Sequence, residues 1–549
     1  MADQPKNKPI GELLEEKGLI TQGHIELALQ DQKVTGERVG EILERLGLIS
    51  QYDVATTIST QEGRKYVEVE HKVPNPDTLR LFNMNLCLNH LFLPYFHDSE
   101  QVILVSTGDD IDSLEKLISR TTGLKPVIRV GEKGKIQNAI QYFYYFLENP
   151  VEKLLTREIK LISADSDGVR SLDPFISYLL QLAIKKRASD IHIRPMDRVI
   201  SVAFRIDGVL RAQFALPLSF KRLIAGTKMK ANMDISEQRL PQDGSFSDVI
   251  LNNHYDFRVS STVCPYGENI VLRVLPAKGD FMSMAQLGLM GEDIEQLTRI
   301  FNEPFGIVLL TGPTGSGKTT TLYAAVRALN LTEKNVVTVE NPIEYRIPLL
   351  RQTQINVKAG YTFANAIRYF LRHDPDVMLV GEIRDGETAQ TAVSASETGH
   401  LVLSTLHTNT AFGAIPRLRS LGIPPFMLAD ALKGVVSQRL VRRICPACVE
   451  TYKPSQDELD YLKDPDIKEL RRGRGCSACH GSGHMGRTVI YEIMRTDPEL
   501  AAMIGRDESV DNLLAAARKS GFQDIFSNAR AKVKLGETSV SEVIRVLGY

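Results

Sequence analysis

The sequence predicts an α/β protein of several domains, and three observations support this prediction. Between about residue 300 and residue 410, short apolar runs alternate with helix-like segments, which is typical of a mostly parallel sheet covered by helices on both faces. One of these runs, 306–310, leads into a glycine-rich loop. The region 9–61 contains an internal repeat with helical periodicity. A chain of 549 residues can form about three or four domains, each with its own core.

Charge balance and the distribution of apolar residues limit the classes of protein to which this chain can belong. The chain carries 66 basic and 67 acidic side chains, so no overall field favours a nucleic-acid polymer as partner. No apolar run approaches the roughly 18 residues that span a bilayer. The stretch 1–8 is polar and lacks the apolar core of a signal peptide. We therefore predict a soluble, cytoplasmic protein without a transmembrane segment.

The N-terminal repeat begins at Pro9 in its first copy and at Arg38 in its second. A Gly-Leu-Ile triplet and a closing Gln recur in register, so each copy is predicted to form a short helix, a glycine-marked stop and a second helix beginning after Thr21 or Ser50. Tandem copies indicate two stacked helical pairs. A small α/β unit is expected to follow and to end near residue 145, and the charged segment 148–172 is typical of a linker.

A further domain is predicted from Asp173 to about Ala277. It opens with a helix over 174–188, and strand-like alternation then leads to an Asp207-Gly208 turn. This region contains Arg205, Arg211 and Arg239. From the sequence pattern alone, the three arginines are interpreted as solvated residues at strand edges.

The glycine-rich loop fills every position of the phosphate-binding pattern and lies between a strand-like run and a helix-like segment, 320–329. Its glycines let backbone N–H groups turn toward an anion, and the helix N-terminus adds to the attraction. Lys318 is expected to reach the β- and γ-phosphates of ATP, and the Thr319 hydroxyl to hold Mg²⁺. A glycine-rich turn without a ligand is the alternative. The predicted nucleotide-binding residues are Gly312, Pro313, Thr314, Gly315, Ser316, Gly317, Lys318, Thr319 and Thr320.

Carboxylates follow two of the apolar runs, where ligands gather in parallel sheets. Glu344 follows the run 336–339, and Glu382 follows the run 376–380. ATP hydrolysis requires one carboxylate that helps to hold Mg²⁺ and one that orients and deprotonates water. Glu382 suits the first role and Glu344 the second, whereas surface salt bridges are the alternative for each. A third run, 401–406, is flanked by His400 and His407.

Four of the six cysteines form two C-x-x-C pairs: Cys445, Cys448, Cys476 and Cys479. In a cytosolic chain, such paired doublets favour one tetrahedral structural zinc. A redox dithiol is the alternative, and His480 or His484 could compete as ligands. Cys87 and Cys264 stand alone and are read as small buried residues.

From about residue 150 to residue 549 the chain resembles the secretion ATPases of the GspE/PilB type, the hexameric motors of type II secretion and type IV pilus assembly. The matching motifs are the Asp box (338–345), the Walker B segment (379–385), the His box (397–408) and the tetracysteine insert. The resemblance implies a RecA-like ATPase domain with Glu344 as the catalytic glutamate and Glu382 as the Walker B carboxylate. It also makes His400 and His407 nucleotide-sensing residues. A platform protein of the inner membrane is the implied partner.

The same resemblance makes the region 173–277 a PAS-like α+β domain that packs over a nucleotide of its own or a neighbouring subunit. Arg205 and Arg211 then become candidates to approach the γ-phosphate, as arginine fingers do, and Arg239 is a third. One position departs from the family, which usually has Asp where this chain has Asn341. An amide cannot act as a base, so the departure bears on turnover more than on nucleotide binding.

The N-terminal repeat resembles the MshEN domain, whose tandem motif binds cyclic di-GMP in some pilus-assembly ATPases. Pro9 replaces the motif's arginine in the first copy and removes a donor for guanine or phosphate. A helical domain that only docks a membrane-platform partner is the alternative. The residues implied for cyclic di-GMP are Arg38, Gly40, Gly47, Leu48 and Gln61 of the second copy and Gly11, Gly18, Leu19 and Gln32 of the first.

The chain is thus predicted to contain six segments. They are an MshEN-like domain (1–147), a linker (148–172), the PAS-like domain (173–277), the ATPase core (278–444), the zinc insert (445–482) and a C-terminal helical region (483–549). Two functions remain from different classes: an ATP-driven motor, and a nucleotide-regulated scaffold with slow turnover because of Asn341. A nucleic-acid motor is disfavoured by the neutral charge and the absence of an aromatic and basic patch.

Overall fold

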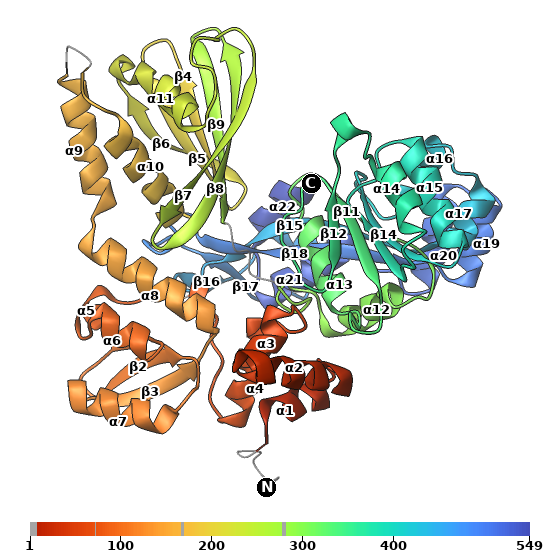
Figure 1. The fold of residues 1–549 in the computed structure, drawn as a ribbon, viewed down its shortest axis with the longest axis horizontal. Coiled ribbons are helices and arrows are strands. Elements are labelled where there is room, and N and C mark those ends of the chain that lie inside the picture. The colour runs from red at the N-terminus through yellow and green to blue at the C-terminus, as the bar shows by residue number, and fades with distance from the viewer. Residues whose placement is uncertain (1–7, 72, 166–168, 277–281) are drawn as a thin grey trace. The chain divides into compact units, whose positions relative to one another are not determined.

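The computed structural model describes residues 8–71, 73–165, 169–276 and 282–549 (Figure 1). The chain forms two compact units: residues 1–65 together with 280–549, and residues 66–279. The first unit holds the predicted ATPase core and the N-terminal repeat. The second holds the small α/β region and the arginine-bearing sheet. Both units mix helices and sheets, which confirms the α/β prediction.

The N-terminal repeat forms two helical pairs, as predicted. The helices are α1 (Ile10–Glu16), α2 (Gln22–Thr35), α3 (Val39–Arg45) and α4 (Gln51–Gln61). Gly18 and Gly47 end α1 and α3 with φ values of 68° and 79°. Their N–H groups bond back to the carbonyls of Glu15 and Glu44, at 2.8 Å in each copy. Glycine is favoured here because other residues are strained at positive φ.

The core of the first unit is a sheet with the strand order β12-β11-β13-β14-β10-β15-β18. All neighbouring strands are parallel except the β15–β18 pair. The strands are β10 (Gly306–Thr311), β11 (Val336–Glu340), β12 (Arg351–Gln354), β13 (Val377–Val380), β14 (Leu401–Leu406), β15 (Leu432–Ile444) and β18 (His484–Arg495).

Alternate residues of the central strands enter two separate apolar cores. Val308 and Leu310 pack with α12 (Gly291–Phe301) and α13 (Lys318–Arg327) on one face. Ile307 and Leu309 pack on the other face with α14 to α17. These helices are α14 (Phe363–Phe370), α15 (Gly386–Glu397), α16 (Ala414–Ser420) and α17 (Pro425–Ala431). Burial on both faces explains why the strands are continuous apolar runs.

Beyond β15 the chain forms a small insert and then a helical end. The insert contains β16 (Val449–Tyr452), α18 (Gln456–Leu462) and β17 (Leu470–Gly473), with β16 and β17 paired antiparallel. The last helices are α19 (Pro498–Gly505), α20 (Val510–Lys519), α21 (Ile525–Leu535) and α22 (Val540–Leu547).

The second unit contains two sheets. The first has the order β1-β2-β3, from β1 (Phe92–His97), β2 (Gln101–Ser106) and β3 (Lys125–Val130). The second has the order β6-β5-β4-β9-β8-β7, and all its neighbouring strands are antiparallel. Its strands are β4 (Ala188–Pro195), β5 (Ile200–Ile206), β6 (Val209–Leu216), β7 (Gln242–Ile250), β8 (Asn253–Cys264) and β9 (Gly267–Pro276).

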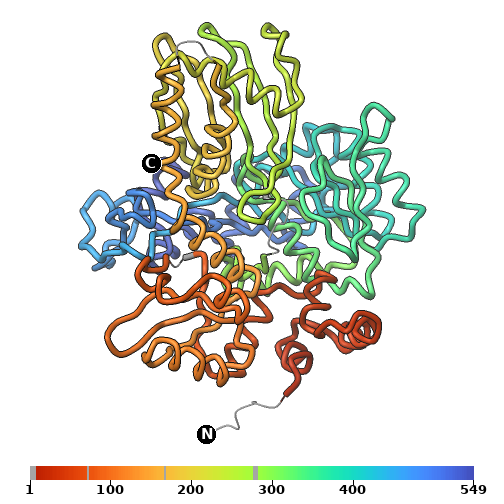
Figure 2. Tube along the Cα trace, turned by 60° about the vertical axis from the view of Figure 1, so that its left-hand side comes forward, coloured from red at the N-terminus to blue at the C-terminus, as the bar shows by residue number. Residues whose placement is uncertain are grey.

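The helices of the second unit include one in the segment predicted as a linker. This helix, α9 (Val151–Ser163), lies beside α10 (Figure 2). It buries Val151, Leu155 and Ile162 in the core of the six-stranded sheet. The other helices are α5 (Pro76–Arg80), α6 (Met84–Asn89), α7 (Ile111–Thr122), α8 (Lys133–Glu148), α10 (Asp173–Lys185) and α11 (Arg222–Lys230).

Candidate active site

The phosphate loop, residues 312–319, lies between β10 and α13, which is the context that the motif requires. Gly312 has a φ of 141°, and a Cβ there would come within 2.4 Å of the carbonyl oxygen of Gln438. The Gln438 side chain donates to the carbonyl of Ser316 at 2.8 Å. Gln438 therefore braces the loop from the neighbouring strand β15, and no motif in the sequence indicated this role.

Polar groups inside the loop are suited to an anion. Lys318 is 9% exposed, and its ammonium donates to the carbonyls of Gly312 (2.9 Å) and Pro313 (3.2 Å). Burial lowers the pKa of Lys318, and the nearby Glu382 carboxylate opposes that shift. Within the described part of the chain, the buried hydroxyls of Ser316 and Thr311 have no hydrogen-bond partner. Such groups fit a phosphate ligand, because a buried hydroxyl without a partner is costly.

Glu382 lies at the same edge of the sheet, two residues after the end of β13. Its carboxylate pairs with Arg384 Nε at 2.6 Å and lies 3.7 Å from His407 Nε2. The structure thus brings together Lys318, Glu382 and His407 at the carboxyl ends of β10, β13 and β14. Arg384, which belongs to the Walker B segment, is an additional member of this group, and no sequence pattern singles it out.

Glu344 and Glu340 occupy different environments. Glu344 is exposed in the loop 341–350, after β11. Glu340 ends β11 and is buried. Its carboxylate accepts hydrogen bonds from Tyr323, from Thr338 at 2.7 Å and from Gln352 at 3.2 Å. These bonds give Glu340 a structural role and leave Glu344 as the carboxylate accessible to a water molecule.

The two histidines that were expected to sense the nucleotide, His400 and His407, flank opposite ends of β14. His400 precedes β14, and its backbone carbonyl accepts from Gly306 N at the start of β10. In the register of the two strands, Leu406 is the residue that pairs with Thr311 beside the phosphate loop. A strand of this length spans roughly 20 Å. His407 therefore lies at the phosphate-loop edge, whereas His400 lies at the opposite edge and cannot sense a nucleotide bound to the same loop.

The four cysteines of the insert come together in space, as their spacing predicted. Their sulfur atoms all lie within 4.8 Å of one another. The pairs Cys445–Cys476, Cys448–Cys479 and Cys476–Cys479 have Sγ–Sγ distances of 3.9, 3.8 and 3.7 Å. Four thiolates about 2.3 Å from one zinc in a tetrahedron would lie about 3.8 Å apart. The cluster therefore fits zinc. No disulfide competes with this interpretation, because all six cysteines of the chain are unbridged.

Comparison with known proteins decides the family. The family model described as "Type II/IV secretion system protein" matches residues 165–545. The chain belongs to this secretion ATPase family. A model of the MshEN domain also matches, over residues 62–149. That match covers the α/β region of the second unit and begins just after the repeat.

Named relatives of this secretion ATPase support the assignment. The type II secretion system protein E of Pseudomonas aeruginosa is 46% identical over 374 residues, which cover 68% of this chain and 74% of that protein. The type IV pilus assembly ATPase PilB of Thermus thermophilus is 35% identical over 511 residues, covering 89% of this chain and 57% of that protein. The solved ATPase DotB of Legionella pneumophila is 22% identical with a TM-score of 0.51, over 69% of this chain and 96% of its own, and shares the fold. The chain is an ATP-hydrolysing enzyme.

The arginines of the secretion ATPase's six-stranded sheet lie on different faces. Arg205 pairs in register with Asp190 and its Nε lies 3.6 Å from that carboxylate. Arg211 pairs with the buried Phe204 on the neighbouring strand. Cross-strand partners share a face, and successive residues alternate between faces. Arg205 and Arg211 therefore cannot approach one phosphate from the same face, and Arg239 is almost fully exposed beside Glu237.

The closing glutamines of the repeat make equivalent contacts. Gln32 donates to the carbonyl of Glu37 at 2.8 Å, and Gln61 donates to the carbonyl of Lys8 at 3.0 Å. Each glutamine thus holds the backbone just before the start of the other copy, so this position of the motif has a structural role. Arg38 at the start of the second copy is exposed.

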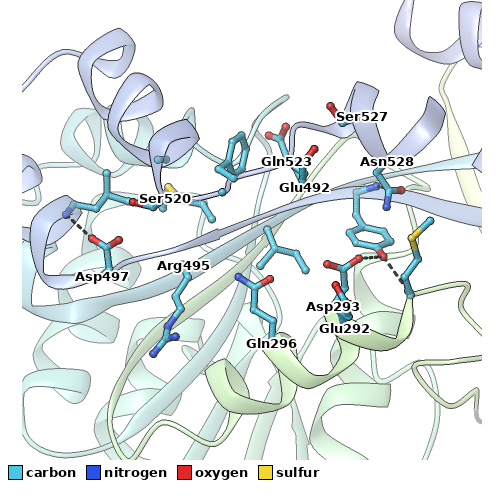
Figure 3. Close-up of a pocket in the computed structure, with 18 of the residues that line it drawn as sticks. Glu292, Asp293, Gln296, Glu492, Arg495, Asp497, Ser520, Gln523, Ser527 and Asn528 are labelled. Atoms are coloured by element: carbon cyan, nitrogen blue, oxygen red, sulfur yellow. Dashed lines mark hydrogen bonds between the residues drawn. The ribbon is translucent and has the colours of Figure 1, made fainter. Parts of the chain in front are cut away.

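A cavity of about 480 Å³ lies beside the edge strand β18, enclosed by α12 and by α19 to α21 (Figure 3). Its buried Glu492 carboxylate accepts from the backbone N–H groups of Ala411 (2.6 Å) and Ile525 (3.1 Å). Burial raises the pKa of Glu492. The lining residues belong to none of the nucleotide motifs, so this cavity is separate from the phosphate site.

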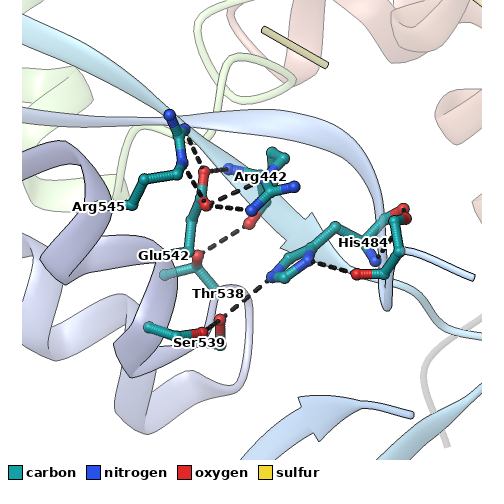
Figure 4. Close-up of polar contacts among 8 residues, drawn as sticks. Arg442, His484, Thr538, Ser539, Glu542 and Arg545 are labelled. Atoms are coloured by element: carbon teal, nitrogen blue, oxygen red, sulfur yellow. Dashed lines mark hydrogen bonds and ion pairs between the residues drawn. The ribbon is translucent and has the colours of Figure 1, made fainter. Parts of the chain in front are cut away.

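A buried charge cluster joins β15 to α22 next to the cysteine insert (Figure 4). Glu542 is fully buried and accepts from Arg442 and Arg545, each with a contact of 2.7 Å. His484 bridges the carbonyl of Ser482 and the hydroxyl of Ser539, so both of its ring nitrogens have partners other than the cysteines. Burial alone would raise the pKa of Glu542, but the two guanidinium groups outweigh it and hold this pKa at about 2.

The Glu542 cluster predicts an acid-sensitive contribution to stability. Because the folded pKa lies below the unfolded value, the contribution is complete above about pH 4.5 and is lost as the pH falls toward 2. The free-energy difference between the wild type and Glu542→Gln, from urea unfolding, is therefore expected to shrink from pH 7 to pH 3.5. A difference that stays constant over this range would contradict the assignment.

Proposed function

We propose that this secretion ATPase is a hexameric motor that couples ATP hydrolysis to the assembly of type IV pili or of a type II secretion pseudopilus. The observation that carries the proposal is the meeting of Lys318, Glu382 and His407 at one edge of the sheet, beside the phosphate loop. Among the described residues, no helix is long and apolar enough to cross a membrane. Work at the cytoplasmic side of the inner membrane would then pass through a platform protein.

Each residue at this edge of the sheet has its own proposed role in ATP hydrolysis. The N–H groups of the phosphate loop and Lys318 would hold the phosphates of ATP. Thr319 and Glu382 would hold Mg²⁺, which neutralises charge on the phosphates when it is bound. Glu344 would orient the attacking water and accept its proton. In a ring, an arginine of the six-stranded sheet, Arg205 or Arg211, would reach the γ-phosphate of its own or a neighbouring subunit.

One preparation of the full chain tests the motor and its metal. We expect a hexamer by light scattering in the presence of ATP, steady ATP hydrolysis and one zinc per chain by elemental analysis. A monomer whose specific activity is independent of protein concentration would contradict the ring. A hexamer that binds ATP but does not turn it over would support the alternative, a nucleotide-regulated scaffold slowed by Asn341. Absence of zinc after purification without chelators would contradict the metal assignment.

We further propose that cyclic di-GMP binds the repeat and regulates the motor. The support is the tandem Gly-Leu-Ile motif of the repeat, which directly precedes the region matched by the MshEN model, residues 62–149. The residues proposed to form the site are those at the helix starts and the glycine-marked turns of both copies, with Arg38 as the main anion-binding group.

Calorimetry on the full chain tests this regulator. Cyclic di-GMP is expected to bind the wild type, and Arg38→Ala is expected to weaken binding by about tenfold or more, because a charge-assisted hydrogen bond contributes about 1.5–3 kcal/mol. Lys33→Ala, an exposed change on α2, serves as the control. No heat with tens of micromolar ligand would contradict the proposal.

A further inference from the structure

The two copies of the repeat have different surroundings, although both belong to the first compact unit. The carbonyl of Gly47 accepts a hydrogen bond from Arg327 Nε at 2.8 Å, and a Cβ at Gly47 would lie 3.1 Å from Ile347. A Cβ at Gly18, the equivalent position of the first copy, would meet nothing within 4 Å. Leu48 is 7% exposed, whereas its counterpart Leu19 is 40% exposed. The second Gly-Leu-Ile turn, residues 47–49, is thus the one that contacts the ATPase core.

This contact joins the repeat to the helix that follows the phosphate loop. Arg327 is the last residue of α13, the helix that begins at Lys318. Burial lowers the pKa of Arg327, and Asp53 and Glu44 of the repeat oppose that shift. Just beyond α13, the side chain of Asn330 lies 2.8 Å from His24 Nε2 of the first copy. Both copies therefore hold the end of α13.

The same turn also contacts the loop that carries Glu344. Ile347 follows Glu344 by three residues and shares one continuous apolar core with Leu43 and Leu48 of the repeat and with Leu322 of α13. The rings of Tyr323 and Tyr345 lie 5.7 Å apart, and the Tyr323 hydroxyl donates to Glu340 at the start of this loop. The position of loop 341–350 is therefore set on one side by α13 and on another by the repeat.

We propose that the second Gly-Leu-Ile turn positions the Glu344 loop for catalysis, with Arg327 and Ile347 as the positioning residues. As a consequence, a ligand that displaces this turn changes the rate of ATP turnover more than the affinity for ATP. That consequence rests on the proposed binding of cyclic di-GMP to the repeat, whereas the positioning role does not.

The full-length Gly47→Ala variant tests the positioning role without added cyclic di-GMP. The matched control is Gly36→Ala, which ends α2 with a φ of 72°, close to the 79° of Gly47, and has open space around it. Both changes strain a left-handed helix end equally, but only Gly47→Ala presses on Ile347. We expect kcat to fall about fivefold or more for Gly47→Ala, since small displacements of a catalytic group reduce rates strongly. We expect KM for ATP to change less than twofold, and Gly36→Ala to keep the wild-type kcat.

A second variant decides the matter if Gly47→Ala fails to fold. Arg327→Met keeps the apolar stem and removes the donor to Gly47, and the same fall in kcat with little change in KM is expected. Wild-type kcat in both folded variants, or an equal loss in Gly36→Ala, would overturn the proposal.

Experiments with cyclic di-GMP distinguish a failure of this proposal from a failure of the proposed regulatory function. The wild type is expected to change its kcat on binding the ligand, whereas Arg327→Met is expected to bind it with a Kd within about threefold by calorimetry and to lose the kcat response. A retained response would overturn the proposed route. If the wild type binds no cyclic di-GMP, the regulatory function fails, and the ligand-free kcat values still decide the positioning role.

Discussion

ATP hydrolysis is expected to fall by about a thousandfold or more when Lys318 is replaced by alanine, because one preorganised charge on the phosphates is worth about 10²–10³ in rate and the variant also loses binding. Lys318 is buried in the phosphate loop, where its charge is poorly screened. The measurement is steady-state phosphate release, with binding of a fluorescent ATP analogue alongside. Both are expected to be lost.

Lys358→Ala is the matched control for Lys318→Ala, since it removes an exposed ammonium from the same domain. It is expected to hydrolyse ATP at the wild-type rate. Equal activity in Lys318→Ala and wild type would show that the measured hydrolysis does not arise at this loop.

Glu344→Gln is expected to lower kcat by about 10²–10⁴-fold, the usual contribution of a general base. The amide keeps the size of the side chain but cannot accept the proton of water. ATP affinity is expected to stay within about threefold of the wild type, because the phosphate loop is untouched. Single-turnover hydrolysis together with nucleotide binding separates the two effects.

Glu333→Gln, at an exposed position after α13, makes the same isosteric change away from the site and is expected to be neutral. If Glu344→Gln keeps the wild-type kcat, another carboxylate provides the base. Glu340 is excluded from that role by its burial and its three hydrogen bonds.

Much of the candidate site was predictable because its residues lie in contiguous motifs. The phosphate loop depends on backbone conformation within eight residues, so a strand before it and a helix after it were enough to predict its geometry. The cysteine cluster depends on two short loops whose spacing suits one metal. The two helical pairs of the repeat followed from the glycine-marked stops.

Strand geometry makes distinctions that the motifs do not make. His400 and His407 were assigned one role from their motif, yet they flank a six-residue strand, and the ends of a strand lie at opposite edges of a sheet. The family resemblance makes both Arg205 and Arg211 candidates to approach the γ-phosphate, and the hairpin register places these two residues on opposite faces of the sheet. In both cases strand geometry, applied to the sequence, separates residues that a motif groups together.

By itself the sequence determined the ATPase class, the phosphate loop, the clustered cysteines and the repeat, because each is encoded by residues close together in the chain. Only the tertiary structure decided which carboxylate is accessible and which Gly-Leu-Ile turn of the repeat meets the ATPase core. Gly47 and Arg327 are separated by 280 positions, and they meet through a backbone carbonyl and an apolar surface. Such contacts leave no spacing pattern, because any residues of suitable shape can form them once the chain has folded.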